Sequence, residues 1–222
     1  MRRMDPLAMA TDPQALLLLL NWMSPTFPTG SFAYSHGLEQ VIADQQANSA
    51  AEVEAWIGAL LQNGSLWGDA VLFSLCWTED PEPLNEFALA LAGSAERHLE
   101  TVSLGKAFAA AAAVWLSSPR TEHNLAYPVA AGTACVAAGI PRAQALLAFL
   151  QGTVAVLVSV AVRLVPLGQT QGLGILRNLS GVIAATAERA ARAGRDGILN
   201  GCVVAEVAAM RHETLETRIF RT

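Results

Sequence analysis

The feature that most limits how this chain can fold is a long segment with almost no charge. Between residues 107 and 176 the only ionised side chains are those of Arg120, Glu122, Arg142 and Arg163. The rest of the segment is rich in Ala, Leu and Val at helical spacing, so helices formed there must be buried on nearly all sides. The sequence therefore predicts a core of central helices.

Helical periodicity also extends over the remainder of the chain, and Gly or Pro interrupts it at intervals. Ser49 and Glu52 have the spacing of a capping box, while Gly139 and Pro141 predict the end of one helix and the first turn of the next. We expect helices near residues 13–23, 32–45, 50–63, 66–78, 83–93, 95–117, 127–138, 141–165, 170–193 and 197–210.

These patterns predict an all-α fold, a single-domain bundle of about ten helices over residues 1–222. No repeat or linker divides the chain, and we expect a flexible N-terminus at residues 1–12. Charged residues make up 15% of the chain, against about 25% in an ordinary domain. A surface with so little charge favours a partner that covers part of it.

Charge and cysteine content exclude two classes of protein. The net charge is −5 and the basic residues are scattered, which argues against a nucleic-acid binder. Cys76, Cys135 and Cys202 are three in number and lie in apolar neighbourhoods, which argues against a disulfide-stabilised protein. We interpret them as buried small hydrophobic residues in a reducing compartment. No segment near the N-terminus has the length of a signal peptide's apolar region, and we expect a cytoplasmic protein.

The segment from Ala143 to Val162 contains 20 residues without a charge, the length needed to cross a bilayer. Polar side chains interrupt it, an arginine lies at each end, and no Trp or Tyr belt flanks it. We interpret it as a buried central helix, with a membrane-associated protein as the alternative.

Residues 24–39, SPTFPTGSFAYSHGLE, form a loop between two helical patterns. Its prolines fix φ, Gly30 permits positive φ, and Ser31 is placed to cap a helix that begins at Phe32. A rigid connector is therefore predicted. It could be a simple interhelical turn or a shaped site.

The segment Ala33-Tyr34-Ser35-His36-Gly37 fits an A-x-S-x-G variant of the hydrolase nucleophile elbow, which makes a serine hydrolase one alternative. An elbow needs a strand before the serine, however, and none is predicted. The histidines at 36, 98, 123 and 212 are far apart, and His36 with Glu39 could supply at most two metal ligands. Nucleotide-binding loops are missing too. We expect no catalytic residue, metal or cofactor.

Three segments together resemble one family. Residues 24–39 are similar to the N-terminal signature of the urease accessory protein UreF, which usually reads close to LPVGAFSYSQGLE. Residues 161–169, AVRLVPLGQ, resemble the family's kLVPxGQ segment, and residues 211–222, RHETLETRIFRT, resemble its closing RHETQYSRLFRS. Among the departures, His36 replaces a commoner Gln and Arg163 stands where some members carry Lys. These differences bear on partner preference.

The resemblance implies a non-enzymatic, all-helical homodimer that bridges the GTPase UreG and the scaffold UreD, also called UreH. GTP hydrolysis on UreG would then drive nickel delivery into apo-urease, so that nickel and GTP are handled by the partner proteins. A generic helical adaptor is the alternative that composition alone leaves open.

The same resemblance implies that partner contacts lie in the three segments. The residues carried over are Pro28, Gly30, Ser31, Tyr34, Ser35, His36, Glu39, Arg163, Gln169, Arg211, His212, Glu213, Arg218, Phe220 and Arg221. For each segment, the alternative is that these residues only pack the fold. For Arg163, the alternative is a structural interaction with the negative C-terminal end of its own helix. Residues 211–222 look too polar to bury themselves, so we expect a tail that a partner orders through Ile219 and Phe220.

Overall fold

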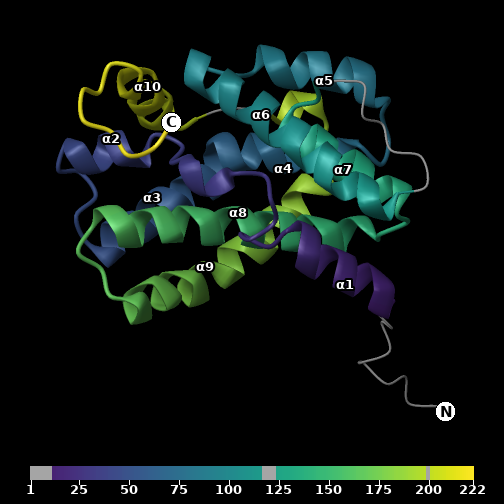
Figure 1. The fold of residues 1–222 in the computed structure, drawn as a ribbon, viewed down its shortest axis with the longest axis horizontal. Helices are drawn as coiled ribbons and strands as arrows, with labels where there is room; N and C mark the ends of the chain where they lie inside the picture. Colours follow the sequence, from purple (N-terminus) through teal and green to yellow (C-terminus); the bar gives the residue numbers. More distant parts are fainter. Residues whose placement is uncertain (1–11, 117–123, 199–200) are drawn as a thin grey trace.

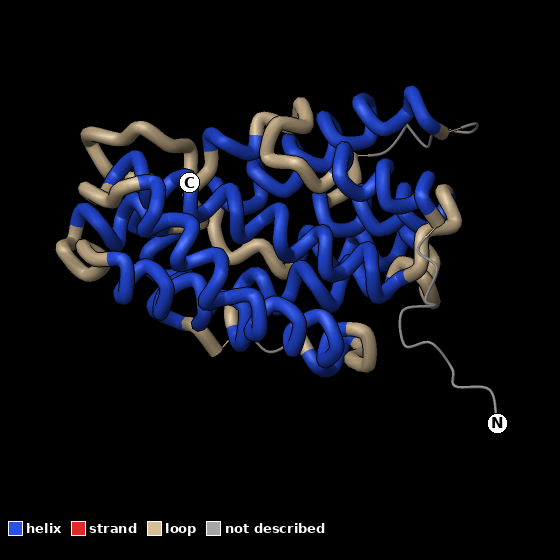
Figure 2. Tube along the Cα trace, turned by 90° about the horizontal axis from the view of Figure 1, so that it is seen from below, coloured by secondary structure: helices blue, strands red, loops and turns tan. Residues whose placement is uncertain are grey.

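The computed structural model describes residues 12–116, 124–198 and 201–222. Within these ranges the chain forms ten α-helices and no strand, which confirms the all-α prediction (Figures 1 and 2). The helices are α1 (Pro13–Trp22), α2 (Leu38–Ala43), α3 (Ala50–Asn63), α4 (Ser65–Leu75), α5 (Pro81–Ala90), α6 (Ala95–Ala112), α7 (Tyr127–Ala137), α8 (Arg142–Leu164), α9 (Gln169–Ala190) and α10 (Val203–His212). Residues 1–11, where a flexible N-terminus is expected, lie outside the described residues.

Helix α8 runs through the middle of the bundle and packs against α9, α4, α2 and α7 (Figure 1). Phe149 of α8 stacks on Phe73 of α4 with ring centroids 4.5 Å apart. By length and composition alone α8 could cross a membrane, yet half of its most apolar window is buried inside the fold. The charge-poor segment thus supplies core helices, but the prediction that they are buried on nearly all sides is wrong for α8, because half of that window lies outside the core.

Several predicted helix ends are confirmed. Ser49 is the N-cap of α3, where its hydroxyl accepts a hydrogen bond from the Glu52 N–H at 3.3 Å. Gly139 follows α7 with a φ of 67°, a left-handed conformation that favours glycine. Pro141 is the N-cap of α8, one position before the first-turn site that the sequence predicts.

The predicted helix over residues 32–45 is wrong at its start, because α2 begins only at Leu38. His36 and Gly37 both have left-handed backbone conformations, with φ of 53° and 77°, and an α-helix cannot continue through them. A Cβ atom on Gly37 would also lie 3.0 Å from the backbone nitrogen of Ala209. The sharp turn at this glycine therefore lets α10 approach α2 closely.

Ser31 does not cap an α-helix, which corrects a second expectation. It begins a single 3-10 turn, η1 (Ser31–Ala33), and Gly30 precedes it with a φ of 78°.

The helix predicted over residues 197–210 begins later in the sequence than expected. A 3-10 turn, η3 (Arg195–Gly197), stands at its predicted start, and α10 begins at residue 203.

The last ten residues, 213–222, run from the end of α10 back across α2, so that the C-terminus lies beside the N-terminal half of the fold (Figure 1). We call this segment the tail. Phe220 is only 3% exposed and Thr222 only 1% exposed. The prediction that the closing segment is too polar to bury itself is therefore wrong for these two residues, because the backbone and polar groups around them find partners on the chain itself, while most of the other tail residues are exposed.

Candidate functional site

The three family-like segments meet at one place on the surface. Arg163, near the end of α8, donates a hydrogen bond from Nη1 to the carbonyl of Phe32 at 3.3 Å. Its guanidinium also lies over the Phe220 ring, 5.6 Å from the centroid. The backbone N–H of Arg221 donates to the carbonyl of Ala33 at 2.8 Å. The loop at residues 32 and 33 thus contacts two segments that lie more than a hundred residues away in sequence.

Below this surface, the carboxylate of Glu39 holds the tail. It accepts hydrogen bonds from the backbone N–H groups of Ile219 at 2.7 Å and Phe220 at 2.9 Å. Glu39 is 5% exposed and lies in the first turn of α2, directly after the glycine turn. Hydrogen bonds to an ionised acceptor are stronger than neutral ones, so this carboxylate is a main attachment point of the tail.

His212, the last residue of α10, is fully buried between two carboxylates. Its Nε2 lies 3.0 Å from Glu39 Oε2, and its Nδ1 lies 2.7 Å from Glu96 Oε2. The other oxygen of Glu96 forms an ion pair with Arg218 of the tail. Helices α2, α6 and α10 and the tail are joined here by charged groups.

A second charged cluster lies one turn further along α6. Glu100, 1% exposed, forms an ion pair with Arg97, and its carboxylate lies 2.8 Å from His36 Nε2 and accepts the Thr222 hydroxyl at 2.9 Å. Burial raises the pKa of Glu100, but the charges of Arg97 and His36 outweigh burial and hold it at about 2. Burial also raises the pKa of nearby Asp69, against the opposing charge of Arg97.

These two clusters form what we call the junction. Its members come from the N-terminal loop, α2, α4, α6, the end of α10 and the tail, and they are Ser35, His36, Glu39, Asp69, Glu96, Arg97, Glu100, His212, Arg218 and Thr222. Buried charges are costly unless paired. Opposite charges from separate segments therefore hold the junction together.

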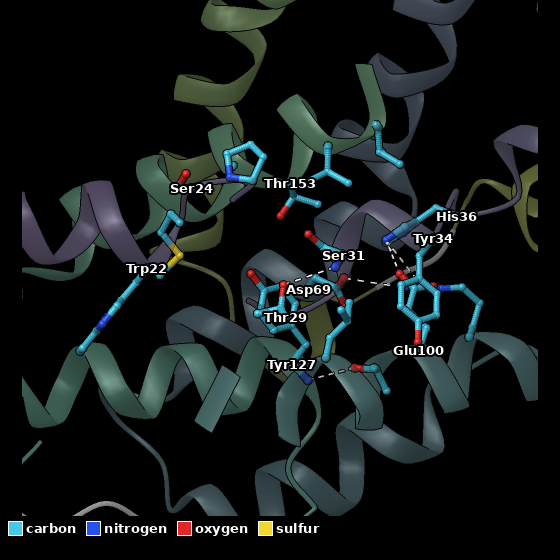
Figure 3. Close-up of a pocket in the computed structure, with 18 residues that line it drawn as sticks. Trp22, Ser24, Thr29, Ser31, Tyr34, His36, Asp69, Glu100, Tyr127 and Thr153 are labelled. Atoms are coloured by element: carbon cyan, nitrogen blue, oxygen red, sulfur yellow. Dashed lines mark hydrogen bonds and ion pairs between the residues drawn. The ribbon is translucent and has the colours of Figure 1, made fainter. Parts of the chain in front are cut away.

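Ser35 has a structural role in this arrangement. Its side chain is fully buried, its hydroxyl donates to the Thr222 carbonyl, and it accepts the Glu39 N–H at 3.2 Å. The ring of His36 is directed to Glu100 instead (Figure 3). A 3-10 turn, not a strand, precedes the serine. The described geometry thus supplies neither the strand nor the serine–histidine pairing of a nucleophile elbow.

A small cavity lies between the N-terminal loop and α6, with Ser31, Tyr34, His36, Asp69 and Glu100 among its lining residues (Figure 3). Its volume is about 40 Å³, which suits a few water molecules and is far below the size of a ligand pocket. His36 Nδ1 is buried without a hydrogen-bond partner, a need that a water molecule would meet.

The predicted partner-binding residues fall into three groups. Those with exposed side chains are Pro28, Arg163, Gln169, Arg211, Glu213, Arg218 and Arg221, those that are half-buried are Gly30, Ser31 and His36, and those that are buried are Tyr34, Ser35, Glu39, His212 and Phe220.

Three of the exposed residues lie away from the convergence of the segments. Arg211 forms an ion pair with Asp44 at 2.6 Å, Glu213 accepts the N–H of Ala95 at 2.8 Å, and Gln169 is the first residue of α9. The structure brings most of the others together at the junction or directly above it.

Sequence reasoning missed the junction residues of α4 and α6, namely Asp69, Glu96, Arg97 and Glu100. One signal in the sequence could have pointed to the two glutamates. Glu96 and Glu100 are four residues apart, and like charges at this spacing repel each other on one helix face. Such a pair calls for basic partners from elsewhere in the chain, and the arginines and histidines of the junction meet this need.

Across residues 12–116, 124–198 and 201–222, no group of three or more His, Cys, Asp or Glu side chains is arranged to hold a metal ion. His123, one of the four histidines considered above, lies outside the described residues.

Fold and site together define an all-helical protein in which buried, paired charged groups hold segments of the same chain together. Apolar and basic side chains are exposed above these groups. A family model described as UreF matches residues 47–180. The urease accessory protein UreF of Rhizobium leguminosarum bv. viciae is 45% identical over 216 residues, covering 94% of this chain and 97% of the relative. The chain belongs to the UreF family of urease accessory proteins.

Two further relatives give the same result. UreF of Agrobacterium fabrum is 44% identical over 215 residues, covering 94% of this chain and 96% of the relative. UreF of Brucella ovis is 42% identical over 219 residues, covering 95% and 96%. These alignments extend well beyond the 47–180 range of the family model, and the resemblance stated from the three segments is confirmed.

Proposed function

We propose that this chain is an adaptor in urease maturation that bridges the GTPase UreG and the scaffold UreD. GTP hydrolysis on UreG would then drive nickel delivery into apo-urease. In this proposal nickel and GTP are bound by the partner proteins, the chain itself catalyses no reaction, and it works as a homodimer in the cytoplasm. Membership of the urease accessory family supports the proposal.

The observation that carries the proposal is the character of the surface where the three segments meet. Phe32 is 59% exposed and Ile219 is 73% exposed, and the exposed arginines Arg163 and Arg221 accompany them. We call these four residues the convergence surface. Large apolar residues beside arginine are typical of protein interfaces. In a chain of net charge −5, such a patch suits a partner surface that combines carboxylates with an apolar depression.

The basic test is urease activation under limiting nickel, with and without this chain, together with co-purification of UreG, UreD and apo-urease. We expect the chain to co-purify with UreD and UreG and urease activity to depend on it. Equal urease maturation in its absence would refute the adaptor function. Binding to these proteins without any effect on activation would leave only a generic helical adaptor.

The test of the surface uses the double variant Ile219→Asp/Arg221→Glu. Both side chains point outward, so we expect normal folding but a loss of partner binding of at least tenfold. The matched control is Arg192→Glu, which reverses a charge on an exposed residue of the α9–η3 connection, away from the three segments. Equal partner binding by both variants would remove the convergence surface from the proposal. Light scattering of each protein measures its molar mass and so tests whether the chain is a dimer.

A further inference from the structure

We propose that α1 and the 3-10 turn η2 (Ala113–Trp115) form a self-association surface, which pairs with the same surface of a second copy of this chain across a two-fold axis. Its exposed apolar residues are Leu16, Leu17, Leu20, Val114 and Trp115, and we call them the leucine face. The inference rests on the homodimer of the proposed function and goes further, because a homodimer by itself does not say which surface forms it.

Helix α1 is apolar on every side but buried on only one. Its sequence, PQALLLLLNW, contains no ionised side chain. Ala15, Leu19 and Trp22 face the core. Leu17 and Leu20 lie one turn apart on the opposite side, and they are 60% and 63% exposed. A helix that is hydrophobic all round is normally buried, so we expect a partner to cover the exposed side of α1.

An apolar groove lies beside this helix on the same surface. Leu20, Val114 and Trp115 line it together with Phe27 and Pro28 of the N-terminal loop. Its volume is about 390 Å³, enough for several side chains. A leucine ridge next to a groove is self-complementary, because a two-fold axis places the ridge of each copy against the groove of the other.

Trp115 is held in place before any partner binds. Its ring packs edge-on against Trp22, with centroids 6.4 Å apart, and lies 6.1 Å from the ring of Phe27. The other side of Trp115 is open, and the residue is 47% exposed. A fixed aromatic side chain loses little conformational entropy on binding, which makes Trp115 the expected anchor of the contact.

The exposed apolar area matches what a stable dimer needs. From their exposed fractions, the five residues of the leucine face expose roughly 500 Å² of surface. Homodimer interfaces are about 65% apolar, so this area corresponds to an interface of about 770 Å² per copy. Stable protein interfaces bury about 800 Å² per partner.

Charge distinguishes the leucine face from the convergence surface. A two-fold axis brings the same residues of two copies close together, so like charges on a self-associating surface repel each other. Among the described residues, no ionised side chain belongs to α1 or lines the groove. The convergence surface carries Arg163 and Arg221 instead, which suits a partner of opposite charge.

The exposed stripe of α10 is the competing surface for self-association. Its residues are Val203, Val204, Val207 and Met210, and they expose roughly 350 Å², less than the leucine face. Figure 1 shows α1 on the opposite side of the fold from α10 and the C-terminus. Pairing through α1 therefore leaves α10 and the tail of each copy open to other proteins.

The experiment measures the molar mass of the full chain by light scattering over a range of protein concentrations. We expect the unsubstituted chain to be a dimer. The variant Leu17→Glu/Leu20→Glu places two carboxylates in the contact, and its dissociation constant should rise by at least about a hundredfold. Both side chains are exposed and glutamate is a good helix former, so circular dichroism should show normal folding.

The matched control is Val203→Glu, which places the same charge on α10 at a similar exposure of 66%. This variant should stay dimeric, and so should Ile219→Asp/Arg221→Glu on the convergence surface. A dimer that survives Leu17→Glu/Leu20→Glu would overturn the inference. Dissociation of Val203→Glu instead would assign self-association to α10, with the same consequence.

Failure of the inference and failure of the proposed function give different results. A dimer that is insensitive to the leucine substitutions refutes the leucine face alone. A chain that is monomeric at every concentration refutes both the leucine face and the homodimer, and another occupant then covers α1. Urease activation that does not need the chain refutes the adaptor function, while the molar masses still test the surface.

Should Leu17→Glu/Leu20→Glu fail to fold, hydrogen exchange of the unsubstituted chain decides. Dilution that dissociates the dimer should increase exchange in residues 13–28 and 111–115 and leave residues 203–212 unchanged, because only the first two segments lose a covering surface. Dissociation that leaves residues 13–28 unchanged would overturn the inference.

Discussion

Phe220 and Ile219 are neighbours in the tail with opposite environments, and replacing each by alanine separates folding from partner binding. Phe220 is 3% exposed and Ile219 is 73% exposed. Replacing a buried phenylalanine by alanine costs about 3–5 kcal/mol of stability, from lost apolar burial and the cavity left behind. Replacing an exposed residue away from special features usually changes stability by about 0.5 kcal/mol or less.

The loss in Phe220→Ala has an upper limit set by the structure. In a molecule whose tail detaches while the helices stay folded, the global loss cannot exceed the free energy of tail docking. We expect a decrease in the free energy of unfolding of about 3 kcal/mol, which corresponds to a decrease in Tm of about 6–12 °C for a chain of this size. Hydrogen exchange should show the tail losing its protection first.

Urea denaturation followed by circular dichroism gives the stability of each variant, and co-purification with UreD gives its binding. Ile219→Ala should unfold like the unsubstituted protein and bind more weakly, whereas Phe220→Ala should lose both stability and binding. Equal stability of the two variants would refute the inside–outside assignment of the tail. Deletion of residues 211–222 should also be destabilising, contrary to the expectation of a tail that only a partner orders.

Two further predictions concern the packing of α8 and the charge of Glu100. A Cβ atom on Gly152 would lie 2.2 Å from the backbone oxygen of Met23, so Gly152→Ala should lower the free energy of unfolding by about 1–3 kcal/mol in urea denaturation. The control is Gly181→Ala in α9, where an added Cβ meets open space. This variant should be neutral or raise the free energy of unfolding by up to about 1 kcal/mol. The pKa of Glu100 is lowered from 4.5 to about 2, so its contribution to stability is fully present above pH 4.5 and is lost as pH falls to about 2. Denaturation between pH 2 and 6 should therefore show a shallower acid limb for Glu100→Gln, and parallel curves for the two proteins would contradict this prediction.

The helices were predictable because their signals are local. The cap at Ser49, the stop at Gly139 and the charge-poor segment that became α8 each depend on residues within one or two turns. The start of α2 was not predictable in this way. Its position depends on left-handed conformations at His36 and Gly37, and only a few per cent of non-glycine residues adopt such a conformation, so the sequence does not mark His36 for it.

The candidate site was predictable only in part, because its contacts join residues far apart in sequence. Resemblance pointed to Glu39 and His212, but nothing local shows that they touch each other, or that Glu96 lies on the far side of the ring. The sequence predicts a tail too polar to be buried, because the polarity of the side chains gives no sign of the contacts that the backbone makes. Its burial depends instead on backbone N–H groups that meet a carboxylate from α2.

This arrangement changes how substitutions in the three family-like segments should be interpreted. Buried members such as Ser35 and His212 hold the loop, α6 and the tail together, so their loss disturbs every surface built on that junction. Exposed members such as Arg221 can be changed with far smaller effects on the fold. A loss of urease activation therefore identifies a partner contact only when the substituted side chain is exposed and the tail is still protected from hydrogen exchange. By that criterion the four residues of the convergence surface are the informative positions, and the junction residues report on the scaffold beneath them.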